Sequence, residues 1–275
     1  MKYLGSKRSI AKAITSILKK NRKPGQLYVE PFVGGANTFE LMENPKIGGE
    51  LNKYQYKLLK ALASGWLPPL VDEEMYDRIH AYYDKGWGKH EWSKGKTAWR
   101  MKPLSDKNSY SDELIGFAGI ALSFKGKWWG GYSRDNSGTR SYAQEALNNV
   151  TKLANKIKGS KFYNTSYDEL DIPAESLIYC DPPYGETTKY SPKETGSFDS
   201  TRFWEWCRTM IKAGHTVFVS EYNAPNDFVP VWTKSMKGTG VAQGKESTEK
   251  LFVHKSQRQT ILLERIVRWD NFVVD

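Results

Sequence analysis

The chain has 275 residues, of which 41 are lysine or arginine and 31 are aspartate or glutamate, so its formal net charge is +10. The chain has no apolar run of about 18 residues and no apolar signal-peptide core, so we expect a cytoplasmic protein without a membrane span. Its two cysteines are too few for a disulfide framework or a metal site. The positive charge, with 10 tryptophans and 16 tyrosines, favours a nucleic-acid partner, because basic side chains attract phosphates and aromatic rings stack on bases.

The predicted elements begin with alternating helices and strands. We expect helices over residues 6–20 (capped by Ser6), 36–42 and 54–63, and strands over 27–29 and 46–51. This order is typical of a parallel α/β sheet, because two parallel strands need a crossover connection, which is usually a helix.

The pattern changes between residues 65 and 160, where helical stretches occur without clear strands. The predicted helices of this part cover 112–124 and 142–157. Sheet signals then return, with a helix over 199–213 and strands over 162–164, 177–180, 216–219, 251–253 and 261–263. We therefore predict one discontinuous α/β domain, residues 1–52 and 161–275, with residues 53–160 inserted as a mostly helical domain.

A turn of small residues follows the first predicted strand. Phe32, Gly34 and Gly35 stand between that strand and the next predicted helix, where glycines allow a close ligand approach and a helix N-terminus offers free N–H groups. Glu50 ends the second predicted strand, 20 positions after Glu30, and an acidic residue at that distance binds ribose hydroxyls in nucleotide-binding α/β folds. Together these features predict a cofactor of the adenosine type, although each alone also fits an ordinary turn or a surface glutamate.

A rigid tetrapeptide follows the apolar strand that ends at Cys180. Asp181, Pro182, Pro183 and Tyr184 place a carboxylate, a prolyl carbonyl and an aromatic ring at the carboxyl end of that strand, where open α/β sheets bind ligands. The exocyclic amine of adenine is a poor nucleophile because its lone pair is delocalised. Two acceptors, the carboxylate and the carbonyl, would hold its two hydrogens, and the carboxylate would stabilise the positive charge that develops on nitrogen.

Four motifs in this order resemble the Dam-type DNA adenine methyltransferases, in the α-group order of amino-methyltransferases. They are Lys2 to Lys7 (KYLGSK), Glu30 to Gly35 (EPFVGG), Glu50 to Asn52 (ELN) and Asp181 to Tyr184 (DPPY). The stretch GKWWGGY is more similar to phage-encoded members. The resemblance implies a Rossmann-like S-adenosylmethionine-dependent methyltransferase sheet, in which residues 53–160 recognise the target.

The resemblance also implies site residues. Asp181, Pro182, Pro183 and Tyr184 would be catalytic. The implied contacts to S-adenosylmethionine come from Tyr3, Lys7, Glu30, Pro31, Phe32, Gly34, Gly35, Glu50, Ser166, Tyr167 and Asp181. No metal is implied. The family more often has aspartate than glutamate at position 50.

The predicted macromolecular partner is double-stranded DNA. The adenine amine is inaccessible inside a duplex, so the base must flip out of the stack. We expect phosphate and base contacts from the basic, aromatic and amide residues of the insert, which are Lys89, Lys94, Lys96, Arg100, Lys125, Lys127, Trp128, Trp129, Arg134, Asn136 and Arg140. The two tryptophans fit packing inside the insert as well. We expect a monomer in solution, with dimerisation on DNA left open, in a restriction–modification or phage anti-restriction setting.

Three alternatives remain at this point. The same site could methylate adenine in RNA, although the basic insert favours duplex DNA. Methylation of a protein glutamine would favour asparagine at the first position of the tetrapeptide, where this chain has Asp181. A catalytically silent DNA-binding relative would show a decayed site, whereas the motif residues are intact.

Overall fold

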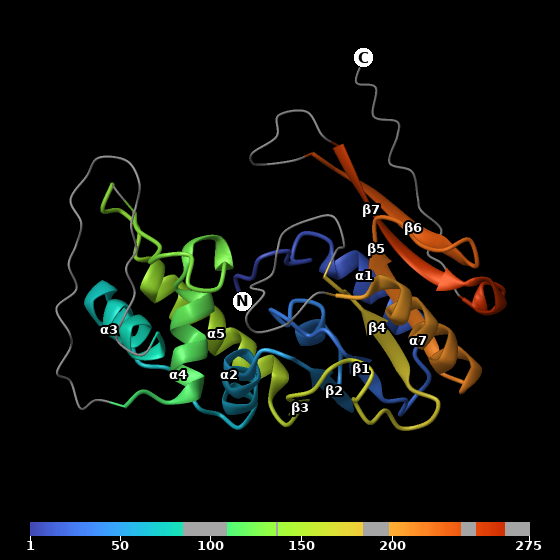
Figure 1. The fold of residues 1–275 in the computed structure, drawn as a ribbon, viewed down its shortest axis with the longest axis horizontal. Coiled ribbons are helices and arrows are strands. Elements are labelled where there is room, and N and C mark those ends of the chain that lie inside the picture. Colours follow the sequence, from blue (N-terminus) through green and yellow to red (C-terminus); the bar gives the residue numbers. More distant parts are fainter. Residues whose placement is uncertain (85–108, 136, 184–197, 238–245, 262–275) are drawn as a thin grey trace, which may run out of the picture.

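The computed structural model describes residues 1–84, 109–135, 137–183, 198–237 and 246–261 (Figure 1). Its centre is a seven-stranded sheet in the order β3-β2-β1-β4-β5-β7-β6. The first five of these strands in that order run parallel, whereas β7 is antiparallel to both β5 and β6. The strands are β1 (Tyr28–Glu30), β2 (Lys46–Gly49), β3 (Lys161–Tyr163), β4 (Leu177–Cys180), β5 (Thr216–Glu221), β6 (Phe228–Lys237) and β7 (Glu246–His254). This sheet confirms the predicted Rossmann-like α/β class.

The helices begin at residues suited to that position. Asn52, Asp72, Ser141 and Asp199 each accept a backbone N–H at the start of a helix, as N-cap residues do. The α-helices are α1 (Ala11–Asn21), α2 (Lys53–Ala63), α3 (Glu73–Tyr83), α4 (Asp112–Gly116), α5 (Tyr142–Ile157) and α7 (Ser200–Lys212). The short helical segments are η1 (Phe39–Leu41), η2 (Phe117–Ala121), η3 (Phe124–Gly126) and η4 (Lys255–Gln257).

The two faces of the sheet bury different side chains. Val29 and Ile178 lie in a cluster with Phe203 of α7, so α7 covers one face. Tyr28 and Tyr179 are buried in a larger cluster that includes apolar residues of α1, α2 and α5. Neighbouring residues of a strand point to opposite faces, which is why a continuous apolar strand such as β4 is buried on both sides.

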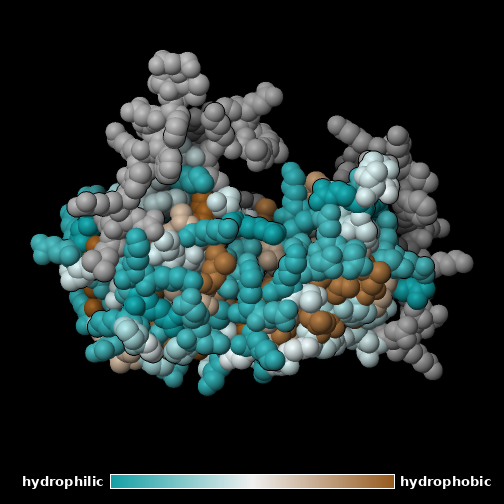
Figure 2. All heavy atoms as spheres, turned by 180° about the vertical axis from the view of Figure 1, so that it is seen from behind, coloured by the Kyte–Doolittle hydropathy of each residue, from teal (hydrophilic) through white to brown (hydrophobic). Residues whose placement is uncertain are grey.

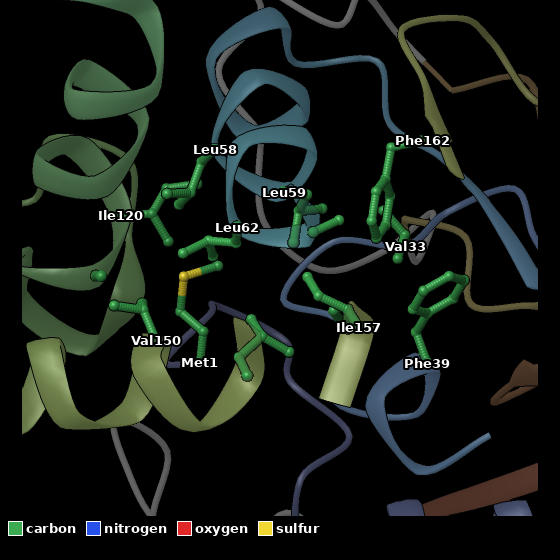
Figure 3. Close-up of a cluster of buried hydrophobic side chains, with 14 of the residues drawn as sticks. Met1, Val33, Phe39, Leu58, Leu59, Leu62, Ile120, Val150, Ile157 and Phe162 are labelled. Atoms are coloured by element: carbon green, nitrogen blue, oxygen red, sulfur yellow. The ribbon is translucent and has the colours of Figure 1, made fainter. Parts of the chain in front are cut away.

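The helices between β2 and β3 share this larger core (Figure 3). Leu58 and Leu62 of α2 pack with Ile120 of η2 and with Val150 and Ile157 of α5 in one buried cluster. That cluster continues into the side chains that cover the sheet. Among the described residues of 53–160 there is no strand, only an isolated β-bridge within the segment. The two predicted domains share one continuous hydrophobic core, so the division into a catalytic domain and an inserted domain stays a prediction.

The structure corrects several predicted elements. The predicted helix over 6–20 is wrong at its start: Ser6 accepts an N–H from Arg8 in a turn, and the helix begins at Ala11. The predicted helix over 36–42 is replaced by the short η1, because Ala36 has φ 56° and a left-handed residue cannot continue a right-handed helix. Of the predicted strand over 261–263, only Ile261 lies within the described residues, and it does not belong to a strand.

The described surface is mainly hydrophilic on the face shown in Figure 2, with hydrophobic residues only in small groups. None of the helices in the described ranges has the length and apolar character that a membrane span requires. Within the same ranges, no three or more histidine, cysteine or acidic side chains form a group that could hold a metal.

Candidate functional site

The glycine turn and the Asp181 stretch lie at the same edge of the sheet. β1 and β4 are parallel neighbours, with Tyr28 opposite Leu177 and Val29 opposite Ile178. The order of the strands reverses between these two, since β2 and β3 lie on one side and β5 on the other. Such a switch point creates a crevice at the carboxyl ends of the strands, which is where open α/β sheets bind ligands.

The N-terminal segment joins the two stretches. A Cβ atom on Gly35 would lie 2.6 Å from Cβ of Tyr3, and one on Gly34 would lie 3.0 Å from the ring, so Tyr3 packs directly on the glycine turn. Four residues later, Nζ of Lys7 lies 2.8 Å from Oδ1 of Asp181. Four residues of extended chain span at most about 14 Å. One short N-terminal segment therefore connects the glycine turn to the Asp181 carboxylate.

Lys7 is a buried cation between two carboxylates. Its side chain is 6% exposed, and its Nζ also lies 3.9 Å from Oε1 of Glu249. Burial acts to lower the pKa of Lys7, but the charges of Asp181 and Glu249 outweigh it and the pKa is raised. The ammonium group therefore stays charged and fixes the position of the Asp181 carboxylate.

Glu50 binds the backbone of the glycine turn. Its Oε2 accepts the N–H of Gly34 at 3.1 Å and its Oε1 accepts the N–H of Asn52 at 2.9 Å. Burial raises the pKa of Glu50 to about 7, although the backbone donors act against the shift. The amide of Gln55 donates to the carbonyl of Gly34 at 2.7 Å, so the turn is held from both sides.

Glu30 has partners that differ from those predicted. Its carboxyl group accepts from the hydroxyls of Tyr28 and Thr38, and the residue is 1% exposed. Burial raises the pKa of Glu30 to about 8. The structure thus places this carboxyl group inside the protein beneath the turn, and its cofactor role stays a prediction. Pro31, also buried, has its carbonyl next to Gly49 of β2.

Phe32 and Tyr167 come together, although 135 positions separate them. Their rings stack with centroids 5.2 Å apart, and both also meet Phe203 edge-on at 5.6 Å. The hydroxyl of Ser166 donates to Asp168 at 2.7 Å. Predicted cofactor residues from two motifs therefore share one aromatic cluster on the α7 side of the sheet.

The predicted DNA-binding residues that the structure describes fall into three groups. Lys125 and Lys127 are exposed on the turn around η3. Trp128 and Trp129 lie in an aromatic cluster; Trp128 stacks on Tyr54 at 5.8 Å, and Trp129 stacks on His80 at 4.4 Å.

The third group consists of two arginines, which are paired within the protein. Arg134 forms an ion pair with Glu73, and Arg140 pairs with Glu145 at 2.7 Å. The predicted site residues that lie outside the described residues are Lys89, Lys94, Lys96, Arg100, Asn136 and Tyr184.

For some residues at this edge, the sequence contains no indication of a role in the site. Glu249 lies on β7 and Glu221 at the end of β5, and neither belongs to a recognisable motif. Leu51 directly follows Glu50 and is 44% exposed. Tyr163 is the last residue of β3 and is 42% exposed. Pairing the predicted strands 216–219 and 251–253 as antiparallel neighbours would have brought Glu249 to this edge.

A family model described as D12 class N6 adenine-specific DNA methyltransferase matches residues 3–249. The chain belongs to this family. The match spans the N-terminal segment, the glycine turn, the Asp181 stretch and Glu249. The predicted DNA adenine methyltransferase family is therefore confirmed.

Individual relatives are more distant. The Type II methyltransferase M.MjaIII of Methanocaldococcus jannaschii is 24% identical over 255 residues, which cover 81% of this chain and 84% of that protein. The crystal structure of SMU.472 complexed with SAH is 13% identical, with a TM-score of 0.30, and the match covers 90% of this chain and 53% of that one. This chain thus spans about half the length of that solved structure, and at this TM-score the two folds are not equated.

Proposed function

We propose that the chain binds S-adenosylmethionine at the carboxyl ends of β1 and β2 and transfers its methyl group to the N6 amine of adenine at Asp181. The observation that carries the proposal is the N-terminal segment, because Tyr3 packs on the glycine turn while Lys7 binds Asp181. A cofactor beside the turn would then have its methyl group near the carboxylate. Membership of the D12 family supplies the substrate class, adenine in DNA.

The residues at the edge fit an adenosine-type cofactor. Glu50 ends β2 with its carboxyl group beside the glycine turn, where it would hold the ribose hydroxyls. Leu51 and Tyr163 expose apolar surface next to it and would lie against the adenine ring. The methionine part would lie along the glycine turn, where Gly34 has φ 45° and allows Tyr3 to pack closely. When bound, S-adenosylmethionine supplies an activated methyl group on a sulfonium.

The target amine is held by acceptors that this chain provides. The Asp181 carboxylate and the Pro182 carbonyl each accept one N–H of the amine, which favours a pyramidal nitrogen with an available lone pair. As the new C–N bond forms, positive charge develops on this nitrogen and the Asp181 carboxylate stabilises it. The surplus proton then leaves from nitrogen to Asp181 or to water. Tyr184 would stack on the base.

Access to the amine requires that the adenine leave the duplex. We propose that residues 53–160 bind the DNA while the base flips out. The exposed Lys125 and Lys127 lie on a turn whose Gly126 carbonyl accepts the N–H of Leu4 at 3.1 Å. The same turn is therefore attached to the segment that carries Tyr3 and Lys7, and phosphate contacts there would be coupled to the site.

The setting of the reaction is also part of the proposal. We expect a cytoplasmic enzyme that uses no metal, because the sulfonium leaves as a neutral thioether and needs no Lewis acid. We expect a monomer in solution; sedimentation with and without duplex DNA measures this and any dimerisation on DNA. The Type II name of the Methanocaldococcus jannaschii relative suggests a restriction–modification setting, and a search for a host nuclease that cleaves only the unmethylated sequence would test this.

The proposed function is tested by methyl transfer from labelled S-adenosylmethionine. Duplex DNA, single-stranded RNA of the same sequence and protein alone are compared as acceptors, and the product nucleoside is identified by mass spectrometry. We expect N6-methyladenine in duplex DNA. Label in RNA only would indicate the RNA alternative, and cofactor binding without transfer to any acceptor would indicate a silent relative.

A further inference from the structure

Two carboxyl groups contact Lys7, a third interacts with it electrostatically, and the three come from neighbouring parts of the sheet. Asp181 directly follows β4, Glu221 ends β5 and Glu249 lies on β7. The pairing of Glu221 with Lys250 places Glu249 and Glu221 at adjacent levels of neighbouring strands. Lys7 binds Asp181 at 2.8 Å and lies 3.9 Å from Glu249, which is 7% exposed. These contacts join residues from the beginning and the end of the chain.

A cation beside Asp181 creates a problem for the proposed chemistry. Positive charge develops on the target amine, so the carboxylate must present a negative potential there. Lys7 fixes the carboxylate but cancels much of its charge. Glu249 offsets Lys7 on another side, so the three groups together carry a net negative charge when all are ionised.

We propose that Glu249 is a positioning residue for methyl transfer, which acts through Lys7 on Asp181. The inference rests on the proposed function. In this arrangement Glu249 holds the Lys7 ammonium group in place and offsets its charge, and Lys7 in turn fixes the Asp181 carboxylate. Glu249 need not touch the adenine.

Other ionisable groups near Asp181 contribute to the same potential. Burial, with a smaller contribution from the charge of Asp181, raises the pKa of Glu221 to about 8, and its Oε2 has no hydrogen-bond partner among the described residues. Glu221 is therefore mainly neutral near pH 7. The ionisable groups that interact electrostatically with Asp181 are Lys7, Glu30, Tyr179, Cys180 and Glu221, and those that interact with Lys7 include Glu249 and Tyr222.

The test is a double-mutant cycle on single-turnover methyl transfer to duplex DNA. We expect Glu249→Gln to lower the rate by about 10- to 100-fold, less than the direct loss of a transition-state contact. Because Glu249 acts through Lys7, the same change in a Lys7→Met background should cost less than about 3-fold. An equal cost in both backgrounds, or an unchanged rate in Glu249→Gln alone, would overturn the proposal.

The pH dependence of the rate separates this role from a structural one. At the acid limb the Asp181 carboxylate takes up a proton. Removing the negative charge of Glu249 should move that limb to lower pH, whereas Lys7→Met removes a positive charge and should move it to higher pH. Shifts in the same direction would contradict the proposal. A structural defect alone would lower the amplitude of the profile and leave its limbs in place.

Two further variants control for folding and for charge. If Glu249→Gln does not fold, Glu249→Asp keeps the charge but withdraws the carboxylate by one methylene, and an unchanged rate there also counts against the idea. Glu205→Gln makes the same change on α7, where the side chain is 67% exposed, and should leave the rate unaltered. An inactive wild-type protein would refute the proposed function itself, whereas an active wild type with additive variants would refute only the role of Glu249.

Discussion

The carboxyl edge of the sheet and the helical segment between β2 and β3 both contain residues with a predicted function. These residues contact one another at the edge, whereas in the helical segment several of them are packed or paired inside the protein. At the edge, Tyr3 meets the glycine turn and Lys7 meets Asp181. In the helical segment, Trp128 lies inside an aromatic cluster and Arg134 is paired with Glu73. Position at a strand end therefore predicts which residues come together, because the ends of neighbouring strands converge, whereas residue type does not, because tryptophan and arginine also serve packing and ion pairs inside the protein.

The two regions also bury different kinds of groups. The edge buries Lys7, Glu30 and Glu50, whose desolvation is expensive unless partners compensate for it. The helical segment buries leucine, isoleucine and aromatic side chains, which stabilise the fold through their apolar area. We therefore expect changes at the edge to affect catalysis and pH dependence, and changes in the helical segment to affect stability or DNA binding.

The largest effect is expected at the edge. Asp181→Ala removes the carboxylate that stabilises the developing cation, so methyl transfer should fall by at least about 1,000-fold, or about 4 kcal/mol in activation free energy. Cofactor binding, measured by calorimetry, should remain detectable. The matched control is Asp171→Ala, which changes an exposed aspartate in the loop before β4. Turnover that persists in Asp181→Ala would remove this carboxylate from the mechanism.

A large effect of another kind is expected in the helical segment. Trp128 stacks on Tyr54, and its indole N–H donates to the hydroxyl of Tyr83 at 3.3 Å. Trp128→Ala should therefore lower the free energy of unfolding by about 2–4 kcal/mol, as judged by denaturant titration. Trp128→Phe retains part of the stacking and should recover part of that loss. If stability is unchanged while DNA affinity falls, Trp128 contacts DNA instead of the core.

A smaller effect on stability is expected from the buried Glu30. Its pKa is about 8 in the folded protein and close to 4.5 when unfolded, so the folded state holds a proton that the unfolded state releases. Its contribution is fully present below about pH 4.5 and is lost as the pH rises through about 8. Glu30→Gln should flatten this decline by on the order of 2 kcal/mol, as measured by denaturant titration from pH 5 to 9. An identical slope in the variant would show that Glu30 is ionised throughout.

The smallest effect is expected from the exposed lysines of the helical segment. Replacing Lys125 and Lys127 by alanine should weaken DNA binding a few-fold and reduce the slope of log affinity against log salt by about 2, since each phosphate contact releases about one counterion. Fluorescence anisotropy between low and moderate salt measures both. Lys158 and Lys161, near the amino end of β3, give a matched double change that should leave the slope as it is. An unaltered slope in the first pair would mean that this turn does not touch phosphate.

The sequence by itself determined the elements whose signals are local. The helix predicted over 142–157 is α5 and the strand predicted over 177–180 is β4, because a helical apolar period and a continuous apolar run can each be recognised within one segment. The glycine turn and the Asp181 stretch were placed correctly at strand ends for the same reason. The short η1 was predicted as a full helix, because the left-handed conformation of Ala36 has no signature in its side chain.

Only the tertiary structure decided which of these residues meet. Lys7 contacts Asp181 and Glu249, residues far from it along the chain, and that contact depends on the order of β4, β5 and β7 in the sheet. Likewise, Arg134 belongs to an ion pair because α3 brings Glu73 to it. Patterns along a sequence report the preferences of neighbouring residues. Strand order and helix packing are set by burying every apolar face at once. Charged groups then pair with the partners that this packing leaves within reach.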